Sequence, residues 1–191
     1  DFDLVGIEPG LFQEVDSDPV LGIGIEAEGL ELGIGFVPPG SDRIATQPLF
    51  EEDFVLIASS RHRFATRRHL PLASLADEPL VLLPGIFCTR RLLNASFEQA
   101  GIVPKVTVEM NSIEGILATV KTSKLATVLP RLSLGLERHD GLRGIPLNNP
   151  TPRRALGLLW KKGGYRSGAA RALADQVRLV VNKRWKQKPG K

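Results

Sequence analysis

The only cysteine of this 191-residue chain, Cys88, is followed by Thr89 and two arginines, directly before an amphipathic segment. Apolar residues at helical spacing between 92 and 100, with Gly101 after them, predict a helix that begins near Thr89. The first N–H groups of a helix have no partner inside the helix, so they can bind an anion. A helix N-terminus and neighbouring arginines also favour the thiolate form of a cysteine. The stretch could therefore bind an anionic ligand or supply a nucleophile.

The sequence "NSIE" at 111–114 predicts a second helix start, with Asn111 as the cap and Glu114 reaching back in a capping box. Both helix starts would follow successive strands of one lobe, which would bring the polar side chains of Thr89, Asn111 and Ser112 near one another. Ordinary helix capping explains these three residues equally well, and Phe87 could either wall a pocket or pack in the core. An anion-binding site and a purely structural role both remain open at this point.

Covalent catalysis by Cys88 would need a base, most often a histidine. The three histidines, His62, His69 and His139, stand in charged, loop-like surroundings, and nothing in the sequence connects any of them with Cys88. We therefore predict that the chain is not an enzyme and has no catalytic residues. A small hydrolase or transferase that uses Cys88 remains the alternative.

Neither a metal nor a cofactor is expected. One cysteine and three scattered histidines do not have the spacing of zinc ligands. The stretch "GIGF" at 33–36 lacks the third glycine of a dinucleotide-binding fingerprint. The neighbouring carboxylates Glu51, Glu52 and Asp53 stand at the entrance of a predicted strand, where we interpret them as a solvated turn and not as an acid/base pair.

Short β-rich runs alternate with helical patterns, which predicts an α/β fold with mostly parallel strands. The expected strands are 30–37, 53–59, 79–84, 105–110, 125–130, 142–147 and 154–162, and a last helix is expected from 169 to about 181. The strands at 53–59 and 154–162 bracket a self-contained β/α block. This organisation predicts two Rossmann-like lobes joined by two crossing strands, with lobe I formed by 1–54 and 161–191 and lobe II by 55–160. A ligand is expected in the cleft between such lobes.

Composition indicates a folded protein, with 42% hydrophobic and 24% charged residues. The chain contains no run of about 18 apolar residues and no signal-peptide pattern, and its single cysteine fits a reducing compartment. We therefore expect a cytoplasmic protein without membrane contact. The net charge is −12 over residues 1–57 and +16 over 58–191. Such a split indicates lobes of opposite charge that face each other, a basic face for an anion, or two solvated surfaces.

The segment "LELGIGFVPPGSDRIATQPLFEEDFVLIASSRHRF" resembles the middle of the effector-binding domain of LysR-type transcriptional regulators. The resemblance continues through "LADEPLVLLPGIFCTRRLL", "FEQAGIVPKVTVEMNSIEGILATVKTSKLATVLP" and "LERHDGLRGIPLNNPTPRRALGLLWKKGGYRSGAARAL", and it covers about residues 14–178. The order and spacing of these pieces carry the resemblance. The segments "VEMNSI", "HDGL" and "LLWKKG" are most similar to the subgroup that contains the cyanate-operon activator.

The resemblance implies a two-lobe fold like that of periplasmic binding proteins, with a small anionic effector held between the lobes. Effector binding would modulate DNA binding and transcription by the full-length protein. The implied effector-binding residues are Ser17 and Phe36 of lobe I, which depend on the resemblance alone, and Phe87, Cys88, Thr89, Asn111 and Ser112 of lobe II.

The resemblance also implies partners. They are the small-molecule effector, further copies of the chain in a homodimer or tetramer, and DNA. DNA would be bound only through a helix-turn-helix that this chain does not contain. The first strand and helix of the sensory domain are also expected to be absent, so a truncated remnant that senses nothing is a further alternative.

Overall fold

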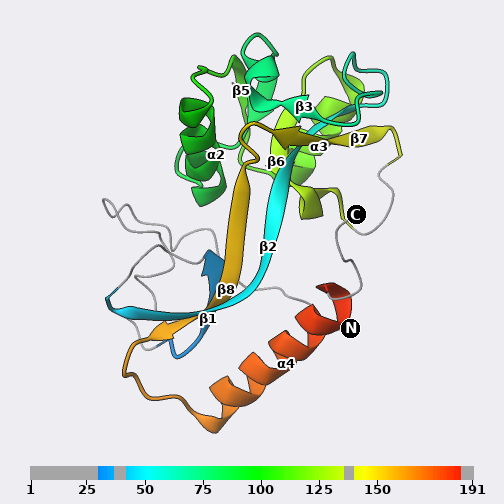
Figure 1. The fold of residues 1–191 in the computed structure, drawn as a ribbon. Coiled ribbons are helices and arrows are strands. Elements are labelled where there is room, and N and C mark those ends of the chain that lie inside the picture. Colours follow the sequence, from blue (N-terminus) through cyan, green and yellow to red (C-terminus); the bar gives the residue numbers. More distant parts are fainter. Residues whose placement is uncertain (1–29, 37–41, 136–139, 186–191) are drawn as a thin grey trace. The chain divides into compact units, whose positions relative to one another are not determined.

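In the computed structural model of the chain, the described residues are 30–36, 42–135 and 140–185. The chain divides into two compact units, one from Asp1–Leu49 and Leu156–Lys191 and the other from Phe50–Ala155, called unit 1 and unit 2 below. Both divisions fall inside long strands, β2 (Ile44–Ser59) and β8 (Arg153–Lys161), which can be followed in Figure 1. Two continuous strands therefore carry the chain from one unit to the other and back.

Unit 2 holds most of the elements between these two strands. In chain order they are β3 (Leu70–Pro71), the 3₁₀ helix η2 (Leu72–Leu75), β4 (Leu80–Leu82), α2 (Cys88–Gln99), β5 (Val106–Glu109), α3 (Ile113–Thr122), β6 (Thr127–Pro130), the 3₁₀ helix η3 (Arg131–Leu134) and β7 (Leu142–Asn148).

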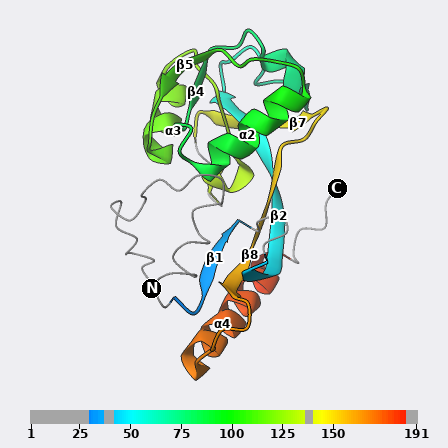
Figure 2. The same ribbon diagram turned by 90° about the vertical axis from the view of Figure 1, so that its left-hand side faces the viewer.

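The core of unit 2 has two sides because successive side chains of a strand point to opposite faces. Leu80 and Leu82 of β4 belong to the apolar cluster that contains Leu93 and Phe97 of α2. The alternate position Val81 belongs to a second cluster, which contains Ile116, Leu117 and Val120 of α3. Helices α2 and α3 therefore cover opposite faces of the strands, as Figure 2 also shows. The continuous apolar run from 80 to 83 is buried throughout, as its sequence predicts.

The expectation of mostly parallel pairing is wrong. Strand β2 pairs antiparallel with both β6 and β7, and β1 (Gly33–Phe36) pairs antiparallel with β8. Parallel pairing is confined to β3 with β7, to β4 with β5, and to a bridge between Leu80 and Ala126. A parallel pair needs a long crossover connection, and α2 supplies one between β4 and β5. Strand β2 instead enters from unit 1 without such a crossover, and β6 and β7 run against it.

Among the described residues of unit 1, helix α4 (Gly168–Trp185) packs on the strands. It places Ala174 and Val177 in one apolar cluster with Leu158 and Trp160 of β8. Gly33 of β1 pairs with Leu159 of β8. Figure 1 shows α4 running alongside β1 and β8. The helix that the sequence predicts at 169–181 is therefore present and extends to residue 185.

Candidate functional site

Two strand ends meet at one edge of the sheet in unit 2. Strands β4 and β5 are parallel, and Leu82 at the end of β4 pairs with Glu109 at the end of β5. Because parallel strands end at the same edge, the loops that lead into α2 and α3 begin side by side. The backbone N–H of Met110 confirms this by donating to the carbonyl of Leu82 at 3.0 Å. The predicted residues 87–89 and 111–112 therefore belong to the same edge of the same unit.

Arg90 ties these two connections together. Its Nη1 donates to the carbonyl of Leu83 at 2.7 Å and to Oε1 of Glu109 at 2.8 Å, while its Nε donates to Oδ1 of Asn94 at 2.8 Å. The side chain is 11% exposed, whereas that of Glu109 is 49% exposed. Sequence reasoning missed this role. The available signal was an arginine in the first helical turn after one strand and a glutamate at the end of the adjacent strand.

Helix α2 begins one residue earlier than predicted, and Thr89 is not its cap. The helix starts at Cys88, and Phe87 occupies the N-cap position in an extended conformation with no side-chain hydrogen bond to the first turn. A phenyl ring has no acceptor, so no N-cap side chain serves the first N–H groups of α2. The backbone N–H groups of Arg90 and Arg91 donate to the carbonyl of Phe87 at 2.9 and 3.1 Å, which leaves those of Cys88 and Thr89 available to an external acceptor. The side chain of Thr89 is half-buried beside them.

Helix α3 is capped by Ser112 and not by Asn111, so the predicted cap is wrong by one residue. The Ser112 Oγ accepts from the backbone N–H of Gly115 at 3.1 Å and donates to Oε2 of Glu114 at 2.9 Å. The backbone N–H of Glu114 itself and the Ser112 hydroxyl lower the pKa of the Glu114 carboxyl below its usual range. Asn111, one residue before the cap, is exposed, and its side chain has no hydrogen-bond partner among the described residues.

Cys88 lies half-buried in the first turn of α2, and its neighbour is an arginine. Nη2 of Arg91 donates to the Cys88 Sγ at 3.1 Å, and Nη1 of the same arginine donates to the carbonyl of Ile86 at 3.1 Å. No histidine among the described residues bonds to this sulfur. His62 instead bonds Oε1 of the buried Glu78 at 2.8 Å through Nε2.

His69 is exposed in the turn before β3, and His139 lies outside the described residues. None of the three histidines is thus seen beside the thiol. Within the described ranges, no group of three or more His, Cys, Asp or Glu side chains gathers as metal ligands would. The same part of the chain contains no helix that is long and apolar enough to cross a membrane.

The aromatic residues predicted for the site differ in their surroundings. Phe87 is partly buried and packs with Met110 against the α3 side of the core, so the packing role that the sequence left open applies to it. Phe36 is half-buried in β1 and belongs to unit 1. Ser17 lies outside the described residues. Effector contact by Phe36 and Ser17 stays a prediction.

The interpretation of Glu52 as part of a solvated turn is wrong, because its carboxylate is buried. Glu52, whose side chain is 3% exposed, forms an ion pair with Arg154 and accepts from the backbone N–H of Leu132 at 3.3 Å. It therefore fixes the start of η3 directly after β6 and is not part of a solvated turn. Its neighbour Asp53 is half exposed and accepts from Nε of Arg153 at 2.7 Å. The pKa of Arg153 is raised by that hydrogen bond.

Comparison with known proteins places this geometry in a family. Residues 23–181 match the family model described as the LysR substrate binding domain. The DNA-binding transcriptional dual regulator OxyR of Escherichia coli K12 is 30% identical over 143 residues, which are 74% of this chain and 47% of that protein. A probable hydrogen peroxide-inducible genes activator of Mycobacterium avium is 25% identical over 178 residues, 91% of this chain and 57% of that protein.

Solved structures agree on the fold. The CcmR regulatory domain of Synechocystis in complex with 2-PG has a TM-score of 0.76 at 20% identity and covers 86% of this chain and 79% of that one. The reduced form of OxyR has a TM-score of 0.66 at 26% identity and covers 86% and 75%. The mixed α/β fold is thus that of LysR regulatory domains, which is like that of periplasmic binding proteins. The chain spans about half the length of the curated relatives, 47% for OxyR of Escherichia coli, and it belongs to the LysR substrate-binding domain family.

Proposed function

We propose that this domain senses a small polar or anionic effector at the edge of unit 2 where α2 and α3 begin, and that binding changes DNA binding by the full-length regulator. The observation that carries the proposal is the start of α2. Its N-cap residue, Phe87, offers no acceptor, and Arg90 holds that start against the end of β5. A fixed helix N-terminus without a capping acceptor attracts an oxyanion through its N–H groups and its dipole.

The polar side chains around this helix start support the same ligand chemistry. Thr89 and Asn111 can donate to the effector, whereas Ser112 is already engaged in capping α3. We therefore assign Ser112 a supporting role and Asn111 a direct contact. Two structures with the same fold have ligands in their descriptions, 2-PG for CcmR and shikimate for the effector-binding domain of QuiR. Shikimate is a carboxylate, which fits a site built from N–H donors.

Thermal melting with a panel of anions tests the proposal. The panel contains shikimate, 2-PG and cyanate, the last because the finer sequence resemblance is to the cyanate-operon activator, and sodium chloride keeps the ionic strength equal. An effector at a hundredfold excess over its Kd raises the free energy of unfolding by about 2.7 kcal/mol. A flat response to the whole panel contradicts an anion-binding edge.

A pair of variants then locates the binding. Asn111→Ala removes an exposed side chain that has no hydrogen-bond partner within the described ranges. It should therefore leave the melting temperature of the free protein unchanged and abolish most of the ligand response. Gln99→Ala, at the exposed last residue of α2, is the matched control and should retain the full response. An equal ligand response in both variants would place the effector elsewhere.

The regulatory part of the proposal concerns the full-length protein. We propose that it assembles into a dimer or tetramer and that DNA is bound by a helix-turn-helix outside these 191 residues. Operator binding by the full-length protein, measured with and without the effector found in the melting panel, tests this step. An effector that stabilises the domain and leaves operator binding unchanged would contradict this step.

A second candidate function is peroxide sensing by Cys88. Relatives from Escherichia coli with 30% identity are named hydrogen peroxide-inducible genes activators, and Arg91 donates to the Cys88 sulfur in this chain. The thiolate would attack one oxygen of hydrogen peroxide, the O–O bond would break, and the products after proton transfer would be a sulfenic acid and water. With one cysteine in the chain, no internal disulfide can follow. Dimedone labelling after peroxide treatment detects the sulfenic acid, and its absence would remove this candidate.

A further inference from the structure

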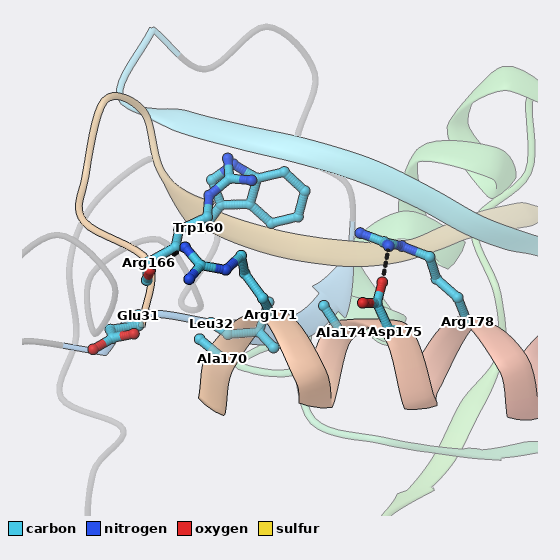
Figure 3. Close-up of a pocket in the computed structure, with 9 residues that line it drawn as sticks. All are labelled: Glu31, Leu32, Trp160, Arg166, Ala170, Arg171, Ala174, Asp175 and Arg178. Carbon is cyan, nitrogen blue, oxygen red and sulfur yellow. Dashed lines mark hydrogen bonds and ion pairs between the residues drawn. The ribbon is translucent and has the colours of Figure 1, made fainter. Parts of the chain in front are cut away.

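Unit 1 contains a cavity of about 180 Å³ between α4, strand β8 and the two residues that precede β1. Three arginines line it, Arg166, Arg171 and Arg178, and its apolar wall includes Leu32, Trp160 and Ala174 (Figure 3). All of these residues belong to unit 1. The cavity is therefore separate from the edge of unit 2 that the proposed function uses.

The two carboxylates of this cavity are already engaged. Asp175 accepts from Nη1 of Arg178 at 2.5 Å, as the dashed line in Figure 3 marks. Glu31 accepts from the backbone N–H of Ser167 at 2.7 Å, and hydrogen bonds from Ser167 lower the pKa of the Glu31 carboxyl. Asp175 thus pairs with Arg178, and Glu31 binds the residue directly before α4.

Arg166 and Arg171 form no ion pair within 4 Å of a carboxylate among the described residues, although the charge of Arg171 contributes to the lowered pKa of Glu31. The guanidinium of Arg166 lies over the ring of Trp160 with its Cζ 3.9 Å from the centroid. Nη1 of Arg171 donates to the backbone carbonyl of Arg166 at 2.8 Å, which leaves its other N–H groups for a ligand. Two exposed cations next to an apolar wall form the usual recognition pattern for a carboxylate or a phosphate.

The residues that line the cavity also carry two buried donors without an acceptor in the described part of the chain. Trp160 is only 9% exposed, and its indole Nε1 has no hydrogen-bond partner there. Nε of Arg178 is likewise buried without a partner, although both Nη atoms of that arginine are bonded, to Asp175 and to Gln47. Buried N–H groups in proteins are almost always bonded. Both donors therefore lie in residues that line the basic cavity and have no acceptor among the described residues.

We propose that this cavity binds a small oxyanion, with Arg166 and Arg171 as its charged contacts and the Trp160 side chain as its wall. The volume is several times that of one water molecule, which occupies about 30 Å³, so it fits phosphate or a small organic carboxylate. Both ligands present the same oxyanion to the arginines. The site goes beyond the proposed function because it lies in the other unit and shares no residue with the effector edge.

The indole N–H resonance of Trp160 in ¹H–¹⁵N spectra of the 191-residue protein reports on this cavity, and Trp160→Phe assigns it. Inorganic phosphate and benzoate are titrated separately, with sodium chloride adjusted to constant ionic strength. The resonance should shift and saturate, and Arg171→Gln should raise the Kd about tenfold, the effect of losing about 1.4 kcal/mol. A response to phosphate alone, to benzoate alone or to both supports the site and identifies the source of the oxyanion.

Two control variants test whether the response to the anions depends on this cavity. Arg67→Gln removes the same charge from an exposed turn of unit 2 and should leave the titration unchanged. Asn111→Ala should also leave it unchanged, so a failure of the proposed effector edge and a failure of this cavity can be told apart. If Arg171→Gln is unfolded, Arg171→Lys keeps the charge and should bind with intermediate affinity. The absence of a saturable shift with both anions, or equal affinity in Arg171→Gln and wild type, overturns the proposal.

Discussion

Nη1 of Arg90 donates to Oε1 of Glu109 at 2.8 Å, which joins the first turn of α2 to the last residue of β5. The same nitrogen donates to the carbonyl of Leu83 at 2.7 Å, directly after β4. One guanidinium thus connects the two strand ends whose following loops form the candidate effector edge. The starts of α2 and α3 are held relative to each other before any ligand arrives.

Arg90→Ala should therefore destabilise the protein by about 2 kcal/mol, since hydrogen bonds to charged groups contribute roughly 1.5–3 kcal/mol and the Leu83 carbonyl loses its bond from Nη1. The matched control is Gln99→Ala, which removes an exposed side chain at the last residue of the same helix and should change the free energy of unfolding by less than about 0.5 kcal/mol. Urea unfolding measures both. Equal effects of the two substitutions would show that Arg90 does not organise this edge.

The sequence predicted the elements of this edge well because their signals are local. A buried apolar run predicted β4, and apolar residues at helical spacing predicted α2 and α3. The helix starts were each misplaced by one residue for different reasons. Asn111 and Ser112 are both good N-cap residues, so the local pattern could not choose between them. Phe87 at the N-cap of α2 has no side chain that can accept a hydrogen bond, so no capping residue marks the exact start of that helix in the sequence.

Features that depend on residues far apart in the sequence were not predicted. Glu52 looked like part of a solvated carboxylate cluster, because its partner Arg154 stands 102 positions later in the chain. Strand β2 extends over 16 residues, although only its apolar end, 53–59, was predicted. Its first part pairs within unit 1, where the polar pattern of "IATQPLFEE" gives little indication of a strand. No local sequence pattern determines the direction in which two strands pair. The antiparallel pairing of β2 with β6 and β7 could therefore not be predicted from the sequence.

Gly101 offers a test of how α2 ends. Its φ of +68° lies in the left-handed region, and an added Cβ would meet no atom within 4 Å. Gly101→Ala should therefore cost about 1 kcal/mol through backbone strain alone. Gly85→Ala is the matched control, because that glycine also has open space around it but no left-handed φ, and it should be neutral or slightly stabilising. Thermal unfolding compares them, and equal stability of the two variants would contradict a left-handed termination of α2.

The cap of α3 couples stability to pH. Because hydrogen bonds lower the pKa of Glu114 in the folded state, its contribution is present above the unfolded pKa and is lost as pH falls through the lower folded pKa. Ser112→Ala should raise the pKa of Glu114 only part of the way to its usual value, since the larger cause, its own backbone N–H, remains. Loss of the cap should also cost about 1 kcal/mol at neutral pH.

Side-chain carboxyl NMR titration measures the pKa of Glu114 in both proteins. The stability difference between wild type and Ser112→Ala should be larger at pH 7 than at pH 3, because the part that depends on the ionised carboxylate disappears in acid. An unchanged pKa in Ser112→Ala would contradict the bond between the Ser112 hydroxyl and Glu114. A stability difference that grows in acid would contradict the sign of the coupling.

The contact in which Arg91 donates to the Cys88 sulfur can be tested by the rate at which iodoacetamide modifies Cys88 at neutral pH. Arg91→Gln should slow the reaction roughly two- to tenfold, the effect of losing a hydrogen bond of about 0.5–1.5 kcal/mol. Arg67→Gln, which removes an exposed positive charge from another part of unit 2, is the control for a general electrostatic effect. Mass spectrometry of the modified protein follows the rate in each case.

The outcome separates the three interpretations of this thiol. A fast reaction that slows in Arg91→Gln, combined with dimedone labelling after peroxide, supports a sensing cysteine. A fast reaction without a sulfenic acid means that the arginine only orders the start of α2. A rate that does not change in Arg91→Gln removes the local basis for both peroxide sensing and a cysteine hydrolase, since no histidine is seen beside the sulfur to activate it. The effector proposal would survive that result, because it depends on the N–H groups of α2 and on Asn111, which need no reactive thiol.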